Sequence, residues 1–99
     1  MRTTLRLASS VRIGLKRLAL EADTTMTDLI RAAVSVGLQD AAGLAAASLA
    51  HRRVSSGVRT TLDLPRDSHR TLKRLAADAD TSVQALVSAA ILQAYPDLA

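Results

Sequence analysis

The chain has 99 residues, a net charge of +4 and no cysteine, which excludes disulfides and thiolate metal sites as sources of stability. Its apolar residues are aliphatic apart from Tyr95, the single aromatic residue, which leaves little room for a sizeable ligand pocket. The excess of 13 Lys and Arg over 9 Asp and Glu suits a polyanionic partner without identifying one.

Neither a membrane span nor a secretory signal is predicted. The longest apolar run, residues 41–47, is far shorter than the roughly 20 residues that a membrane-spanning helix requires. The first twenty positions carry five basic side chains at intervals and lack the continuous apolar stretch of a signal peptide. We therefore expect a cytoplasmic protein without a membrane partner.

The first predicted element is a strand at "RTTLRL", residues 2–7. Thr3, Leu5 and Leu7 alternate with polar residues, as in a strand that has one buried and one solvated face. Apolar residues then recur at helical spacing over residues 11–22, which predicts a first helix whose buried stripe ends at Ala22.

A turn and a second helix follow. Asp23, Thr24 and Thr25 favour turns and helix N-caps, and the apolar residues from Met26 to Val34 predict a buried helical face. Residues 1–38 thus form one unit of strand, helix, turn and helix. The next segment, residues 39–57, is rich in alanine and predicts a linker that can form a short helix.

The same unit is repeated over residues 58–99. A shift of 57 positions without a gap aligns residues 2–40 with 59–97, and 17 of the 39 pairs are identical. "RTTLDL" repeats the strand, Pro65 marks its junction with the next helix, and Asp80 begins the second turn. A repeat of this kind indicates an architecture built from two similar units.

The two units are expected to share one core. Each has about forty residues, too few to bury a stable core alone. Each also supplies a single strand, and the two strands pair most simply with each other. We expect a mainly α fold in which a two-stranded antiparallel ribbon lies over four helices.

The order of these motifs resembles the ribbon-helix-helix family of DNA-binding proteins, which includes the Arc and Met repressors. The second unit, "RTTLDLPRDSHRTLKRLAADADTSVQALVSAAI", is similar to the family's strand, Leu-Pro junction, "LxxLA" helix, polar turn and helix start. The first unit matches equally well except that Ala8 replaces the proline. Family members usually pair two chains, whereas this linker, at about 3.3 Å per residue, is long enough for pairing within one chain. The resemblance therefore implies an intramolecular pseudodimer of two ribbon-helix-helix repeats.

One position departs from the family. Asp23 and Asp80 stand where the family commonly has glycine or asparagine. Asp can also adopt a left-handed backbone conformation, so we expect the turn to be kept.

The resemblance implies that the ribbon enters the major groove of double-stranded DNA. There Arg can donate two hydrogen bonds to guanine, Thr can bind a base or contact the thymine methyl group, and Asp can accept from cytosine. The alternative is an ordinary solvated face of a small sheet, which the repeat and the helices make the weaker interpretation. The residues expected to read bases are Arg2, Thr4, Arg6, Arg59, Thr61 and Asp63.

The start of each unit's second helix is expected to hold a DNA phosphate, because its backbone amides are unpaired and it carries the positive end of the helix dipole. Thr25 and Ser82 are also expected to cap these helices. Lys16-Arg17 and Lys73-Arg74 recur on the first helices, where we expect solvated faces. The residues expected at the phosphate sites are Thr25, Met26, Thr27, Ser82, Val83 and Gln84.

The two units differ in sequence, whereas the two subunits of a homodimer are identical. Arg6 suits guanine whereas its counterpart Asp63 suits the cytosine amino group, so we expect a preference for a non-palindromic site.

Each unit also has an apolar patch where the other is polar or small. We expect the linker helix to cover one patch and a second molecule on DNA to meet the other. The patches are Ile13 and Leu20 in the first unit and Ala85, Ser88 and Leu92, which replace Asp28, Arg31 and Ser35, in the second.

No catalytic, metal or cofactor site is predicted. Asp67, Ser68 and His69 are neighbours in sequence and point in different directions on a helix, so they cannot form a hydrolytic triad. The two histidines lack clustered carboxylates, and no glycine-rich phosphate loop is present. The segment 51–53, "HRR", is expected to be a soluble linker end rather than a DNA-binding arm. We expect a protein that is not an enzyme and that associates with the bacterial nucleoid if it binds DNA.

A small transcriptional repressor is the first expectation for function. An antitoxin that binds a toxin protein and represses its own operon is an alternative, but the resemblance then implies a toxin-binding tail, and few residues follow Tyr95. A plasmid-partition protein that binds a centromere-like array also fits, although such proteins commonly carry a basic N-terminal tail. The alternative without DNA is a pure oligomerisation module.

Overall fold

The computed structural model describes residues 2–51 and 57–98. The protein is mainly helical and has one two-stranded antiparallel sheet, as predicted. Its elements in chain order are β1 (Arg2–Leu7), α1 (Ser9–Glu21), α2 (Met26–Gly37), η1 (Leu38–Asp40), α3 (Ala41–Ser48), η2 (Leu49–His51), β2 (Val58–Asp63), α4 (Arg66–Asp78), α5 (Val83–Ala94) and η3 (Pro96–Leu98).

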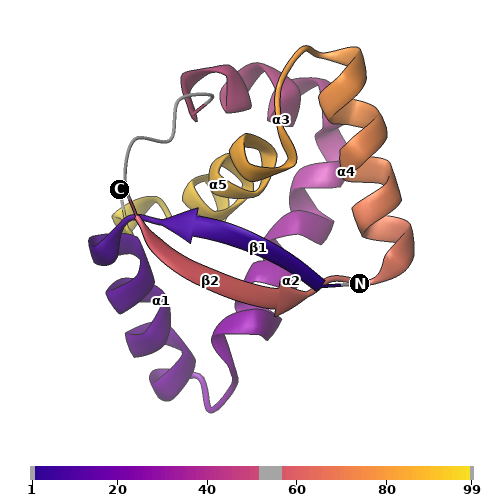
Figure 1. Cartoon of the computed structure of the whole chain (residues 1–99). Coiled ribbons are helices and arrows are strands. Elements are labelled where there is room, and N and C mark those ends of the chain that lie inside the picture. Colours follow the sequence, from indigo (N-terminus) through magenta and orange to yellow (C-terminus); the bar gives the residue numbers. More distant parts are fainter. Residues whose placement is uncertain (1, 52–56, 99) are drawn as a thin grey trace.

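The two strands form a ribbon that crosses in front of α2 and α5, with α1 and α4 on opposite sides (Figure 1). Alternate residues of each strand point to the same face of the ribbon. Leu5, Leu7 and Leu62 point inward and are buried in the shared hydrophobic core, whereas the opposite face is exposed. The period-two pattern in the sequence therefore identified the correct face of each strand.

The helices α1 and α4 pack through few residues. Leu15 and Ala19 are buried on α1, and Leu72 and Ala76 are their counterparts on α4. The predicted stripe was wrong at Ala22, because α1 ends at Glu21 and Ala22 is an exposed C-cap residue.

Both helix–turn–helix connections close in the same way. Asp23 and Asp80 have φ angles of 53° and 54°, the left-handed conformation predicted for them. The amide of Thr24 donates to the carbonyl of Ala19 at 2.9 Å, and Thr81 donates likewise to Ala76. This is the Schellman arrangement, which satisfies carbonyl groups at a helix end.

The helices α2 and α5 pack against each other in the centre of the molecule. Ile30 and Val34 from α2 and Leu86 and Ile91 from α5 are fully buried. Close packing continues at the end of α2, where a Cβ atom on Gly37 would lie 3.3 Å from the Cβ of Ala90.

The linker forms helix α3, which packs on α5. Asp40 caps this helix by accepting a hydrogen bond from the Gly43 amide at 3.2 Å. Leu44 is 1% exposed, and the hydroxyl of buried Ser48 lies 2.9 Å from the hydroxyl of Thr81. The linker therefore contributes to the core and contacts the second turn.

The helical run Met26–His51 has 26 residues and a mean hydropathy of 1.3, values that would suit a membrane-spanning helix by length and composition. It consists of α2, η1, α3 and η2, and its two α-helices both pack against α5. Core helices reach similar hydropathy, so the absence of a membrane span stays a prediction.

Candidate nucleic-acid interface

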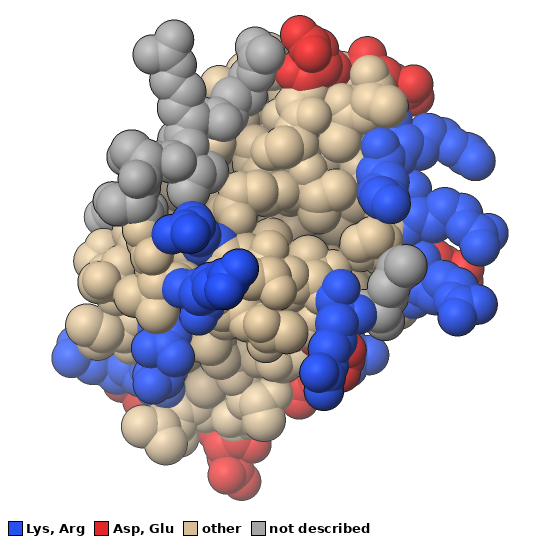
Figure 2. All heavy atoms as spheres, in the orientation of Figure 1, with Lys and Arg blue, Asp and Glu red and all other residues tan. Residues whose placement is uncertain are grey.

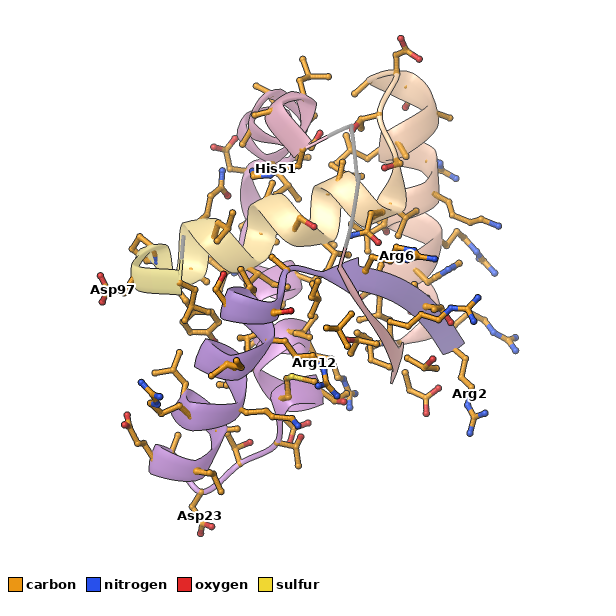
Figure 3. The ribbon with its side chains drawn as sticks, turned by 60° about the vertical axis from the view of Figure 1, so that its left-hand side comes forward. Arg2, Arg6, Arg12, Asp23, His51 and Asp97 are labelled. Carbon is orange, nitrogen blue, oxygen red and sulfur yellow. The ribbon has the colours of Figure 1, made fainter. Side chains whose placement is uncertain are left out.

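The outer face of the ribbon is polar. All six residues predicted to read bases are exposed there, and Figure 2 shows Lys and Arg side chains spread over this side of the molecule. In Figure 3 the side chain of Arg2 projects away from the body of the protein. The six residues are Arg2, Thr4 and Arg6 on β1 and Arg59, Thr61 and Asp63 on β2.

The strand register gives this face two different ends. Thr4 pairs with Thr61 at the centre, where the two hydroxyl oxygens are 3.2 Å apart. Arg6 pairs with Arg59 on one side, and Arg2 pairs with Asp63 on the other. One end of the face therefore carries two guanidinium groups, and the other end carries a guanidinium and a carboxylate.

The helix starts on either side of the ribbon are capped as predicted. Thr25 accepts a hydrogen bond from the Asp28 amide at 3.1 Å, and Ser82 accepts one from the Ala85 amide at 3.0 Å. The first amides of a helix have no acceptor within the helix. Those of Met26 and Val83 therefore retain the arrangement that can hold an anion.

Gln84 has a role that the sequence did not indicate. Its side-chain Nε2 donates to the carbonyl of Arg6 at 2.8 Å, and its Oε1 accepts from the amide of Arg6 at 2.7 Å. These two bonds hold the start of α5 against β1. The phosphate site was predicted from the backbone amides at the start of this helix, and the side-chain bonds of Gln84 to Arg6 leave its own amide available for that role.

The start of α2 has a different environment. Thr27, the counterpart of Gln84, is too short for a comparable contact and lines a hollow of about 430 Å³. Arg2, Thr61, Leu62 and Asp63 line the same hollow. The ribbon is thus held by a side-chain clamp on its β1 side and borders an open hollow on its β2 side.

A group of basic side chains on α4 lies outside the predicted site. Arg66, His69, Arg70 and Lys73 line a common hollow of about 310 Å³. The sequence signal for this group was the spacing i, i+3, i+4, i+7, which places residues on one helical face. From the sequence, Lys73 was expected to lie on a solvated face and His69 was considered only as a catalytic or metal-binding residue, so none of the four was predicted to bind DNA.

Helix α3 packs on α5, where Ser88 and Leu92 of the predicted apolar patch are half-buried. Ala85 is fully buried, whereas its counterpart Asp28 is exposed and lies 3.8 Å from Arg31 in an ion pair. On α1, Ile13 and Leu20 are 57% and 83% exposed. Of the two patches, the one on α1 is therefore open to a partner.

No family model, curated protein or solved structure matches the chain. The function is therefore inferred from the geometry of the ribbon and its flanking helices.

The residues considered from the sequence for metal binding or catalysis lie as follows. Within residues 2–51 and 57–98, no three His, Asp or Glu side chains gather in a way that could hold a metal ion. Asp67, Ser68 and His69 are successive residues of α4. His51 is the last residue of η2, and Arg52 and Arg53, the other members of the basic segment, lie outside the described residues.

Proposed function

We propose that the protein is a single-chain ribbon-helix-helix DNA-binding protein that acts as a small transcriptional repressor. One observation carries the proposal: Thr4 pairs with Thr61, the residue 57 positions later, and 57 is also the offset of the sequence repeat. Exchanging the two repeats turns the pair Arg2–Asp63 into Arg59–Arg6, which is also a pair of the ribbon. This relation supports a pseudodimer whose two-fold axis passes between Thr4 and Thr61.

The dimensions and chemistry of the ribbon fit the major groove. Two strands lie about 4.8 Å apart, and the groove is about 12 Å wide, so a two-stranded ribbon can enter with its outer face toward the bases. Arg2, Arg6 and Arg59 supply the donors that recognise guanine. The starts of α2 and α5 flank the ribbon and can bind the phosphates on either side of the groove.

The open patch on α1 supports an extension of this proposal. Ile13 and Leu20 form an apolar surface that a second molecule, bound beside the first on DNA, would cover. A toxin protein is the alternative occupant, and it would make the protein an antitoxin that regulates its own operon. A partition role would use the same ribbon on a repeated DNA site.

Binding to a random-sequence duplex library, measured over a salt series, tests the proposal. We expect selection of a defined sequence, and Arg2→Ala, Arg6→Ala and Arg59→Ala should each weaken binding to it by roughly 5- to 150-fold, the cost of about 1–3 kcal/mol for a lost bidentate contact. Arg17→Ala, on α1, is the control and should retain the preference. Equal affinity for all sequences, unchanged by the three ribbon substitutions, would contradict base recognition, and no DNA binding at all would favour a protein partner.

A further inference from the structure

We propose that α4 forms an additional DNA contact, a phosphate-binding flank that is present on one side of the ribbon only. The proposal rests on DNA binding by the ribbon. It adds a contact that determines the orientation of the protein on its DNA site. The partner of α4 is the sugar-phosphate backbone of the same duplex, beyond the bases that the ribbon reads.

The four residues of the flank act as one surface. Arg66, His69, Arg70 and Lys73 lie on one face of α4 and line one hollow of about 310 Å³. The Arg and Lys members are exposed, so their charged groups are available to a partner. Asp67, the acidic residue in the first turn, lies about 100° around the helix from Arg66 and therefore off this face.

The position of α4 suits a phosphate contact. The helix begins three residues after β2 ends at Asp63, so it follows the end of the ribbon where Arg2 and Asp63 pair. Figure 2 shows Lys and Arg side chains over α4 on the same side of the molecule as the exposed face of the ribbon.

The first unit has no equivalent flank. The matching positions on α1 are Ser9, Arg12, Ile13 and Lys16. Arg12 is partly buried, with a buried Nε atom, and Ile13 is an exposed apolar residue. Because Arg and Lys side chains supply most of the salt-dependent affinity for DNA, the α4 side should bind the backbone more strongly than the α1 side.

Two double variants with the same change in net charge test this contact. Arg70→Gln/Lys73→Gln removes two charges from α4, and Lys16→Gln/Arg17→Gln removes two from α1. Binding is measured over a salt series on the tightest duplex from the random-sequence selection. Each phosphate contact adds about 0.9 to the slope of log affinity against log salt, so the α4 variant should lower this slope by roughly 1–2, and the α1 variant should leave it unchanged.

The pattern of backbone protection gives a second measurement. Hydroxyl-radical footprints of the wild-type protein should extend further on one side of the selected sequence, and the α4 double variant should lose that extension while it keeps the same sequence preference. Arg70→Lys, which keeps the charge, should retain the extension. Unchanged urea-unfolding midpoints show that the variants are folded.

The outcomes separate this inference from the proposed function. If the wild-type protein selects a sequence but the two double variants have the same salt slope and a symmetric footprint, the α4 contact is wrong and base reading by the ribbon stands. If the wild-type protein binds no DNA, both proposals are wrong.

Discussion

At the scale of single residues, the difference between Arg6 and Asp63 has the largest consequence for the proposed recognition of DNA. The two residues occupy the same position in the two strands, but Arg6 lies opposite Arg59 and Asp63 lies opposite Arg2. The alternation of polar and apolar residues was enough to predict that both point outward. Their consequence for DNA depends on the register of the ribbon, which sequence periodicity alone does not determine.

Replacing Asp63 with Arg makes both strands read "RTTLRL". We expect Asp63→Arg to convert the preferred DNA sequence from a non-palindromic to a palindromic one, because both halves of the ribbon then present the same groups. Arg6→Asp is the matched variant and should select a different palindrome. Selection from random duplexes measures both, and a palindromic preference of the wild-type protein would refute the expected asymmetry.

Gln84 shows where sequence reasoning was insufficient at this scale. Its position at the start of α5 was predicted, but its partner Arg6 is 78 residues away in the chain. A side-chain amide that binds a strand backbone leaves no periodic or local signal. The contact becomes visible only when α5 is placed against β1.

Gln84→Ala should lower the free energy of unfolding by about 1–3 kcal/mol, because it removes the two hydrogen bonds to the backbone of Arg6, worth about 0.5–1.5 kcal/mol each. Thr27→Ala, at the equivalent position in the first unit, is the control and should change stability by less than about 0.5 kcal/mol, as is usual for substitutions away from special contacts. Urea denaturation measures both. Equal effects of the two substitutions would contradict the clamp.

At the scale of elements, local signals predicted the two turns and the two N-caps well. Asp23, Thr25 and Ser82 each act on backbone groups within a few residues, so their roles could be inferred without tertiary information. For α3, composition predicted a short linker helix over an apolar patch, but local signals did not identify which of its residues are buried. Its alanine-rich sequence lacks a helical apolar period, and the burial of Leu44 results from packing on helices that are distant in sequence.

Leu44→Ala tests whether α3 is part of the core or only a connection. We expect a loss of about 2–5 kcal/mol in the free energy of unfolding, the usual cost of truncating a fully buried leucine. Leu49→Ala is the control, since Leu49 follows α3 and is 49% exposed. If α3 is only a linker, thermal and urea unfolding will show small and similar effects for both variants.

At the scale of the whole molecule, two short units build one core around α2 and α5, with the ribbon on one side. A core shared by both halves of the chain was expected from the sequence, because neither repeat has enough residues to fold alone, and buried residues of both halves do lie in one cluster. The pseudodimer itself stays a proposal. Pairing of β1 with β2 inside one chain also removes any need for a second molecule to complete the ribbon.

Intramolecular pairing predicts that folding does not depend on protein concentration. The chain should sediment as a monomer in the absence of DNA, and its thermal unfolding midpoint should stay constant when it is diluted, because no subunit dissociates on unfolding. A midpoint that rises with concentration would indicate that strands are exchanged between chains.

Base reading in the major groove by the outer face of the ribbon, as proposed, is tested most directly by methylation of guanine N7. This atom lies in the major groove and is one of the two acceptors that an arginine binds. We predict that methylation of particular guanines within the selected sequence blocks binding of the wild-type protein, and that Arg6→Ala loses sensitivity at one of them. Sequence-selective binding that is unaffected by methylation at any guanine N7 would contradict the claim.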